Sequence, residues 1–147
     1  MENIYKQITS IIKNEVKIKH MGCIYRCLLQ KAINEKLFYS VQENDKIIGF
    51  AMCRFLKTKN LLSIDKIGVH PDFRGKNIGT KIINDIKSNY KYIRIDVVSE
   101  NTNAINFYKK NGFVSVGKKV LGKNINVTIM TYGNWFIWKR NYQTPIN

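Results

Sequence analysis

The segment from residue 61 to residue 98 constrains the fold most, because its hydrophobic pattern changes period twice within a short length. Leu61–Val69 has the apolar pattern of a β-strand and is followed by Pro71, which cannot donate a hydrogen bond to a β-ladder. Gly79–Asn89 places its isoleucines on one helical face, and Tyr92–Val98 returns to strand character. A strand, a helix and a strand within about 35 residues predict a crossover unit with two parallel strands.

The sequence on either side of this unit predicts helices and antiparallel strands. Apolar side chains at three- and four-residue spacings indicate two helices near the amino end, with a break around Gly22. The expected additional elements are helices at 4–18, 21–33 and 103–110 and strands at 37–41, 47–52, 113–121 and 125–132. Because the chain contains no internal repeat and no Pro/Gly/Ser-rich linker, we expect a single α/β domain over residues 1–147.

The composition is strongly basic, with 25 Lys and Arg residues against 10 Asp and Glu residues and a formal net charge of +15. Twenty of the cations are lysines, and they are spread along the chain. This pattern fits an A/T-rich coding sequence and a generally solvated surface, and it also fits an electrostatic footprint for nucleic acid. Charge alone therefore leaves both alternatives open.

Several classes of protein are excluded by simple features of the sequence. The longest apolar run, Ile47–Cys53, has seven residues, far fewer than the roughly 20 that cross a bilayer. The first residues show no secretory signal, and three cysteines cannot all pair within one chain. We therefore expect a folded cytoplasmic protein without a membrane-spanning helix.

The turn from Val69 to Thr80 carries the first indication of a ligand. A strand that passes through glycines into a helix directs several free backbone N–H groups and the positive helix end toward one point, which suits an anion such as a pyrophosphate. The same pattern is also an ordinary way to begin a helix. It does not fit a Walker loop, which needs Gly-Lys-Ser/Thr, or the dinucleotide fingerprint with three spaced glycines.

Two motifs in this chain resemble those of the GNAT superfamily of N-acetyltransferases. Residues 74–79 match the Arg/Gln-x-x-Gly-x-Gly/Ala signature at Arg74 and Gly79, with Asn77 at the position of the middle glycine. Asn is the residue that adopts positive φ most readily after glycine, so the turn can keep its shape. Residues 101–108 match Asn-x-x-Ala-x-x-x-Tyr, and Gly112-Phe113 follows as in the family.

The resemblance implies a mixed, mostly antiparallel central sheet with a splayed parallel strand pair, flanking helices and acetyl-CoA as the acyl donor. It implies that the strand backbone at 67–69 pairs with the pantetheine arm and that the amides of 75–80 hold the pyrophosphate. The residues expected at the coenzyme are Ile67, Gly68, Val69, Arg74, Gly75, Lys76, Asn77, Ile78, Gly79, Thr80 and Asn101. Within the domain, 1–36 would be a helical acceptor-side segment, 61–113 the acetyl-CoA-binding core and 134–147 an aromatic and basic tail.

Each of these residues also has a purely structural interpretation. Ile67 and Val69 can be core residues, and Asn101 can be the N-cap of the following helix. His70, which precedes Pro71, is expected to be a turn residue. His20, Cys23 and Cys27 share one helix face but offer only three ligands, so no metal site is expected.

The resemblance also implies two catalytic residues. Tyr108 would stabilise the leaving thiolate as a general acid, although it can also be a buried aromatic beside Phe107. Asp96 would be the base, because ribosomal-protein α-amine acetyltransferases carry a glutamate at this strand position, whereas Ser63 occupies the position of the histone-type base. Asp96 can equally be a charged strand-end residue paired with Arg94.

The sequence predicts an N-acetyltransferase that acts on a primary amine by direct attack, and it leaves the acceptor open. At neutral pH, about one α-amine in six is uncharged, whereas about one lysine amine in a thousand or fewer is uncharged. A site without a strong general base therefore favours an acceptor amine of low pKa. One alternative is a toxin-like or nucleic-acid-directed acetyltransferase acting on charged tRNA. The other is a protein that lacks catalysis and binds tRNA or DNA through its basic surface. An exposed aromatic tail would also allow a homodimer.

Overall fold

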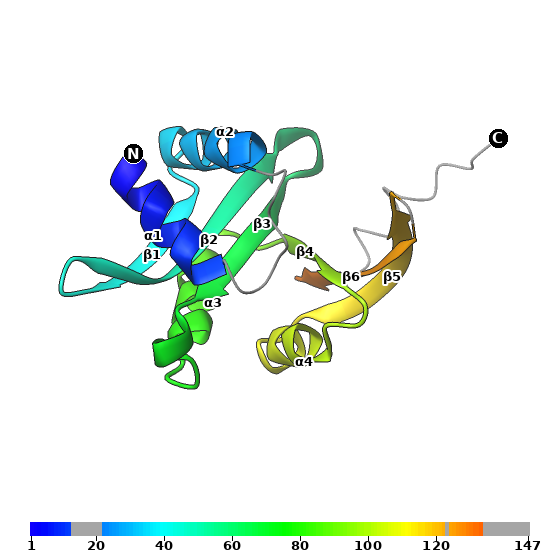
Figure 1. Cartoon of the computed structure of the whole chain (residues 1–147). Helices are drawn as coiled ribbons and strands as arrows, with labels where there is room; N and C mark the ends of the chain where they lie inside the picture. Colours follow the sequence, from blue (N-terminus) through cyan, green and yellow to red (C-terminus); the bar gives the residue numbers. More distant parts are fainter. Residues whose placement is uncertain (13–21, 123, 134–147) are drawn as a thin grey trace. The chain divides into compact units, whose positions relative to one another are not determined.

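The computed structural model describes residues 1–12, 22–122 and 124–133. Its elements in chain order are α1 (Glu2–Ile12), α2 (Gly22–Asn34), β1 (Phe38–Glu43), β2 (Lys46–Leu56), η1 (Lys57–Lys59), β3 (Leu61–Val69), η2 (Pro71–Phe73), α3 (Ile78–Asn89), β4 (Ile93–Val98), α4 (Thr102–Lys110), β5 (Val114–Leu121) and β6 (Ile125–Tyr132). Figure 1 shows this order along the chain.

The strands pair in the order β1-β2-β3-β4-β6-β5. The pairs β1–β2, β4–β6 and β5–β6 are antiparallel. β3 and β4, which α3 connects, form the parallel pair, and near the start of that pair the Leu62 N–H donates to the Tyr92 carbonyl at 3.0 Å. The expected fold class is therefore confirmed: a mixed, mostly antiparallel sheet with one parallel pair and four helices within the described ranges.

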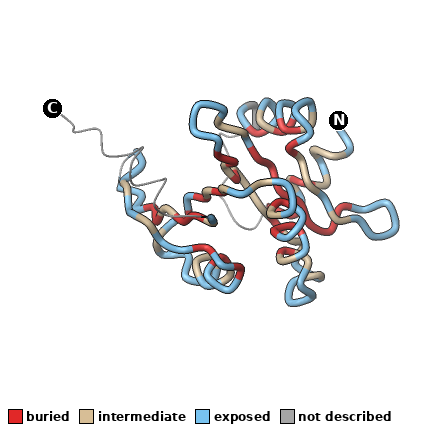
Figure 2. Tube along the Cα trace, turned by 180° about the vertical axis from the view of Figure 1, so that it is seen from behind, coloured by how far each residue is buried: buried red, intermediate tan, exposed pale blue. Residues whose placement is uncertain are grey.

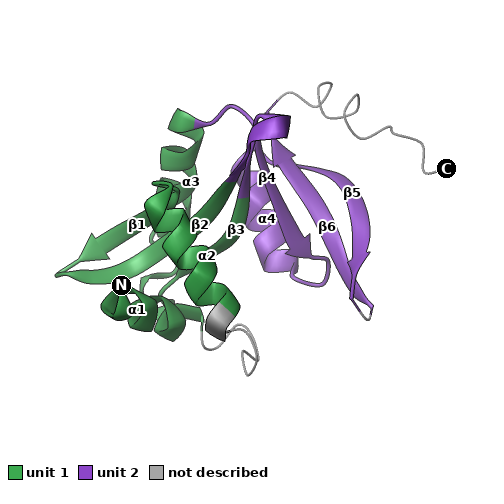
Figure 3. Ribbon diagram, turned by 90° about the horizontal axis from the view of Figure 1, so that it is seen from above, with its two compact units in different colours: residues 1–54, 64–89 green, residues 55–63, 90–147 purple. Residues whose placement is uncertain are grey.

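The chain divides into two compact units (Figure 3). Unit 1 consists of Met1–Arg54 and Ile64–Asn89, and unit 2 of Phe55–Ser63 and Tyr90–Asn147. The expectation of a single domain stays a prediction. The buried strand residues lie on β2, β3, β4 and β6, whereas β1 and β5 contain none. Figure 2 shows the buried residues along the trace of the chain.

In unit 1, helices cover both faces of the strands. The side chains of Phe50 and Met52 on β2 belong to one buried cluster with residues of α1 and α2. Gly49, the neighbour of Phe50, faces the opposite way, because a β-carbon there would meet Ile78 and Ile82 of α3. The alternation of a β-strand therefore places α1 and α2 on one face and α3 on the other.

The β1–β2 hairpin closes at Asn44 and Asp45, which both have positive φ (48° and 61°). Two such residues make the type I′ turn that matches the twist of antiparallel strands. The register shifts between Val41 and Gln42, and the Ile47 N–H near this shift donates to the Gln7 side-chain oxygen at 2.7 Å. The Gln7 side chain on α1 thus satisfies a buried strand amide.

The predicted helix at 4–18 is confirmed only in its first part, because α1 runs from Glu2 to Ile12 and 13–21 lie outside the described residues. The tail at 134–147 also lies outside them. The other expected elements are present with boundaries shifted by few residues. No helix in the described ranges is long and apolar enough to span a membrane.

Candidate functional site

The loop after β3 begins with a short 3₁₀ turn that local contacts hold in place. The His70 Nδ1 accepts a hydrogen bond from the Asp72 N–H at 3.4 Å, so His70 caps the turn as expected. The His70 N–H donates to the Ile48 carbonyl at 2.8 Å and ties the loop to β2. The Arg74 Nε donates to the Val69 carbonyl at 3.1 Å, which fixes the far side of the turn to the end of β3.

The chain then enters α3 through two residues with left-handed backbone, Gly75 (φ 76°) and Asn77 (φ 60°). Asn77 therefore adopts the conformation expected for the residue at the middle glycine position. The first helical hydrogen bond runs from the Lys81 N–H to the Asn77 carbonyl at 2.9 Å. Among the described residues, the six amides from Gly75 to Thr80 have no backbone acceptor.

These six amides form a concentrated set of donors at the positive end of a twelve-residue helix. Residues 74–77 are exposed, so the first amides of this set are accessible to a ligand. Free N–H groups and the helix dipole together suit a phosphate or pyrophosphate. The loop before α3, which belongs to unit 1, therefore offers the hydrogen-bond donors that a pyrophosphate requires.

The last residues of β3 are held by the core. Gly68 is buried, and a β-carbon there would lie 3.0 Å from the Phe50 ring and 3.1 Å from Ile11. Ile67 and Val69 on either side are half-buried. A larger residue at position 68 would require the Phe50 and Ile11 side chains to shift, so β3 is closely packed against α1 at this point within unit 1.

In unit 2, Asn101 caps α4. Its side-chain oxygen accepts a hydrogen bond from the Ala104 N–H at 3.1 Å. Asn101 is thus the N-cap of α4. Its contact with the coenzyme stays a prediction.

Tyr108 lies at the other end of α4, where a Schellman motif closes the helix. The Phe113 N–H donates to the Tyr108 carbonyl at 3.0 Å, and the Gly112 N–H donates to the Lys109 carbonyl at 2.9 Å. The Tyr108 side chain is 3% exposed, with its ring edge-on to Phe107 and Phe113 at centroid distances of 5.1 and 5.5 Å. The Asn111-Gly112 pair ends the helix as expected, and the motif fixes the tyrosine in the aromatic core of unit 2.

Asp96 on β4 has two cationic partners. Arg94 donates to its carboxylate at 2.8 and 3.1 Å, and Lys119 on β5 forms a second ion pair with it. Partial burial alone would raise the pKa of Asp96, but the hydrogen bonds and charges of Arg94 and Lys119 outweigh it and lower the pKa. A carboxylate held in its ionised form is a weaker base, and the role of Asp96 as the base stays a prediction.

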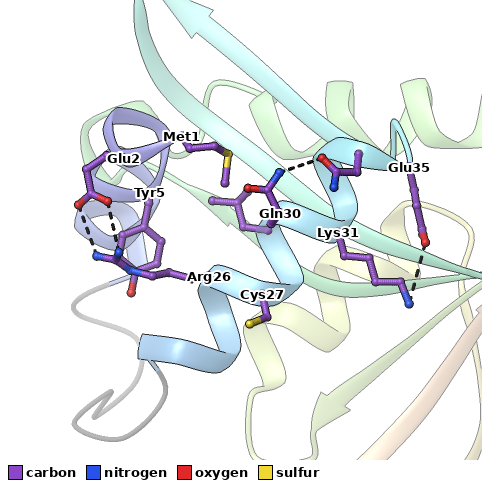
Figure 4. A pocket seen from close by; sticks show the side chains of 10 residues that line it. Met1, Glu2, Tyr5, Arg26, Cys27, Gln30, Lys31 and Glu35 are labelled. Carbon is purple, nitrogen blue, oxygen red and sulfur yellow. Dashed lines mark hydrogen bonds and ion pairs between the residues drawn. The ribbon is translucent and has the colours of Figure 1, made fainter.

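The helical segment 1–36 carries a surface hollow of about 620 Å³ between α1 and α2 (Figure 4). On its wall Arg26 stacks over the Tyr5 ring at 4.3 Å and pairs with Glu2 at 3.3 Å. Lys31 pairs with Glu35 at 3.9 Å, so the two cations are matched by two carboxylates. His20 and the side chain of Cys23 lie outside the described residues, while Cys27 is exposed.

A model of the acetyltransferase (GNAT) domain family matches residues 34–115, which is more than half of the chain. The chain belongs to the GNAT acetyltransferase family. An uncharacterized N-acetyltransferase of Methanocaldococcus jannaschii is 34% identical over 90 residues, a match that takes in 54% of this chain and 40% of that relative. The peptidyl-lysine N-acetyltransferase YjaB of Salmonella typhimurium is 25% identical over 120 residues, which are 77% of this chain and 79% of YjaB.

Solved structures share the GNAT fold of this chain. The ribosomal-protein-S18-alanine N-acetyltransferase from Escherichia coli has a TM-score of 0.70 and 14% identity, with coverage of 90% of this chain and 88% of that one. Naa50 of Arabidopsis thaliana, solved in complex with the bisubstrate analogue CoA-Ac-MVNAL, has a TM-score of 0.71 and 20% identity, with coverage of 91% and 95%.

Two residues of this GNAT domain were not singled out by the sequence. Gly49 lies within an apolar strand, and an isolated glycine in such a strand is a recognised sign of close backbone approach, so this position could have been found. Lys119 is 23 residues from its partner Asp96 along the chain. No local pattern links these two residues, because their contact depends on the pairing of β4 and β5 with β6.

Proposed function

We propose that this protein is an N-acetyltransferase that transfers the acetyl group of acetyl-CoA to a primary amine. The observation that carries this proposal is the set of six backbone amides from Gly75 to Thr80 at the start of α3. In this proposal these amides bind the pyrophosphate of the coenzyme, and the backbone at Ile67–Val69 pairs with the pantetheine arm. The Arabidopsis Naa50 structure, with its CoA-containing analogue, supports the choice of coenzyme.

The proposed reaction is a direct attack of the neutral amine on the thioester carbonyl. A C–N bond forms, the C–S bond breaks, the amine loses one proton and the thiolate gains one. Tyr108 is the proposed donor to the departing thiolate. Full proton transfer from a phenol near pKa 10 to a thiol near 8.5 is uphill by about 2 kcal/mol, so a hydrogen bond that stabilises the developing charge is the more economical role.

We assign the amine proton to water rather than to Asp96. The ion pairs of Asp96 with Arg94 and Lys119 keep it ionised and engaged. A site without a strong base requires an acceptor that is already partly neutral near pH 7, which favours an α-amine near pKa 7.7 over a lysine near 10.4. We therefore propose the α-amine of a polypeptide as the acceptor class.

The test is a thiol-release assay with acetyl-CoA and three acceptors: a peptide with a free α-amine, the same peptide blocked at its α-amine but containing lysine, and a polyamine. We expect the free α-amine to react fastest at pH 7, and intact mass spectrometry to find one added acetyl group. A faster reaction with the blocked lysine peptide would contradict the acceptor class. Coenzyme binding without thiol release for any amine would contradict the catalytic proposal itself.

A further inference from the structure

Among the described residues, unit 2 has few acidic residues to balance its cations. The described residues of unit 2 carry eight Lys and Arg residues but only two Asp and Glu residues, whereas those of unit 1 carry eleven and seven. One of the two acids, Asp96, is already neutralised by Arg94 and Lys119.

Part of this charge gathers at one end of the strands of unit 2. The segments 55–63 and 90–93 meet there, because the Leu62 N–H donates to the Tyr92 carbonyl and the Phe55 and Tyr90 rings lie 5.7 Å apart. β6 also ends there, since a β-carbon on Gly133 would collide with the Lys91 carbonyl. Neither of the two segments contains an acidic residue.

Both segments contain lysines as well as aromatic residues. We define the lysine–aromatic surface as Phe55, Lys57, Lys59, Tyr90, Lys91 and Tyr92. Its three lysines are exposed, and its three aromatic residues are half-buried, so that each ring is packed and still partly accessible. Lys91 lies over the Tyr92 ring at 5.6 Å, which brings charge and ring into one place.

We infer that the lysine–aromatic surface binds single-stranded nucleic acid. Lysine ammonium groups neutralise backbone phosphates, and aromatic faces stack on bases without sequence preference. The carboxylates of an acidic protein segment would pair with the lysines but would gain nothing from the electron-rich ring faces, whereas bases stack on them. This inference concerns a surface that the proposed acetyl transfer does not use, so it stands or falls independently of that function.

The test measures fluorescence anisotropy of a labelled oligouridylate of about 12 nucleotides, a length within the usual site size of such surfaces, with the full chain and no coenzyme. Three phosphate contacts predict a log–log salt slope of about −2, so the affinity falls about 20-fold between 50 and 200 mM salt. We expect an RNA duplex of the same length and polyglutamate to compete more weakly than the unlabelled single strand.

Matched variants distinguish binding at the lysine–aromatic surface from attraction by the net charge of the protein. The variant Lys57→Gln/Lys59→Gln/Lys91→Gln should weaken binding about tenfold and flatten the salt slope. The control Lys109→Gln/Lys110→Gln/Lys118→Gln removes the same charge from other exposed parts of unit 2 and should change the affinity less than threefold. Tyr90→Leu should weaken binding with little change in slope, and circular dichroism confirms that each variant is folded.

Three results would overturn the inference. The first is no measurable binding at 50 mM salt. The second is an equal loss of affinity in the two triple variants, which would mean that diffuse charge alone attracts the strand. The third is competition by polyglutamate as strong as that of the unlabelled oligonucleotide, which would identify an acidic polypeptide as the ligand class.

Discussion

A β-carbon on Gly49 would lie 2.6 Å from the Cγ2 of Ile78, the first residue of α3. β2 and the beginning of α3 approach each other more closely here than any larger residue permits. The amides proposed to bind the pyrophosphate belong to this same helix end. The position of the candidate coenzyme loop within unit 1 therefore depends on a residue that lies on another strand and has no side chain.

Gly49→Val should displace α3 and weaken both folding and coenzyme binding. Overpacking of this kind costs about 1–3 kcal/mol, to be measured by urea denaturation, and calorimetry should show a lower affinity for acetyl-CoA. The control is Gly117→Ala, because the nearest atom to a β-carbon there is 4.0 Å away. An unchanged coenzyme affinity in a destabilised Gly49→Val protein would mean that the loop does not depend on this contact.

Asn77 holds its left-handed backbone at φ 60°. Asn77→Ala should lose about 1 kcal/mol of stability, because a β-carbon without a compensating side chain is strained in this region. Asn77→Gly should retain the turn and the affinity for acetyl-CoA. Thermal unfolding and calorimetry of the pair check this, and equal behaviour of the two variants would show that backbone strain is unimportant here.

Asn101 allows the cap and the proposed coenzyme contact to be measured separately. Asn101→Ala should reduce stability by about 1 kcal/mol through loss of the hydrogen bond to Ala104. Asn101→Ser keeps a capping oxygen and should retain that stability. If Asn101 also contacts the coenzyme, the serine variant will show a raised Kd for acetyl-CoA, and a wild-type Kd would leave only the structural role.

Tyr108→Phe should lower kcat by about 10²-fold with little change in acetyl-CoA affinity, because only the hydroxyl group that stabilises the thiolate is removed. The matched control is Tyr132→Phe, whose ring contacts Phe113 in the same aromatic cluster at 5.8 Å. Steady-state kinetics of both variants test the proposal. Wild-type turnover in Tyr108→Phe would remove this residue from the mechanism.

Asp96→Asn should destabilise the protein at neutral pH by about 1 kcal/mol, because Arg94 and Lys119 lose the carboxylate between them. The lowered pKa of Asp96 in the folded state means that this stabilisation is fully present above the unfolded value of about 3.9 and is lost as the pH falls through the folded value. The stability difference between variant and wild type should therefore vanish in strong acid.

The same variant separates structure from catalysis. If water takes the amine proton, kcat for Asp96→Asn should stay within about threefold of wild type, whereas loss of a true base would cost about 10²-fold or more. Asp85→Asn, on the exposed side of α3, serves as the control for removal of one carboxylate. A large loss of turnover with a flattened pH–rate profile would restore Asp96 as the base.

Much of the fold could be predicted from local patterns. Isoleucines at helical spacing mark α3, and the Asn111-Gly112 pair marks the end of α4, because both signals arise from neighbouring residues. The left-handed conformation of Asn77 could also be predicted, since a motif position normally held by glycine requires it. These features need no knowledge of how the strands pair.

The environment of Asp96 could not be predicted in full, because it depends on strand order. Arg94 is two residues away and was a foreseeable partner, but Lys119 reaches the same carboxylate from β5, with β6 between the two strands in the sheet. A second cation turns an ambiguous strand-end acid into a firmly ionised one. Predicting that change requires the register of three strands.

The strand β5 stands last in the sheet order, and its register shifts between Ser115 and Gly117. The irregular pairing is followed at once by Lys118 and Lys119. A kinked border strand with adjacent ammonium groups is a poor template for a further strand, even though Val114 and Val120 are exposed. At this edge of the six strands that the described ranges contain, the chemistry of β5 therefore disfavours edge-to-edge pairing with a second chain.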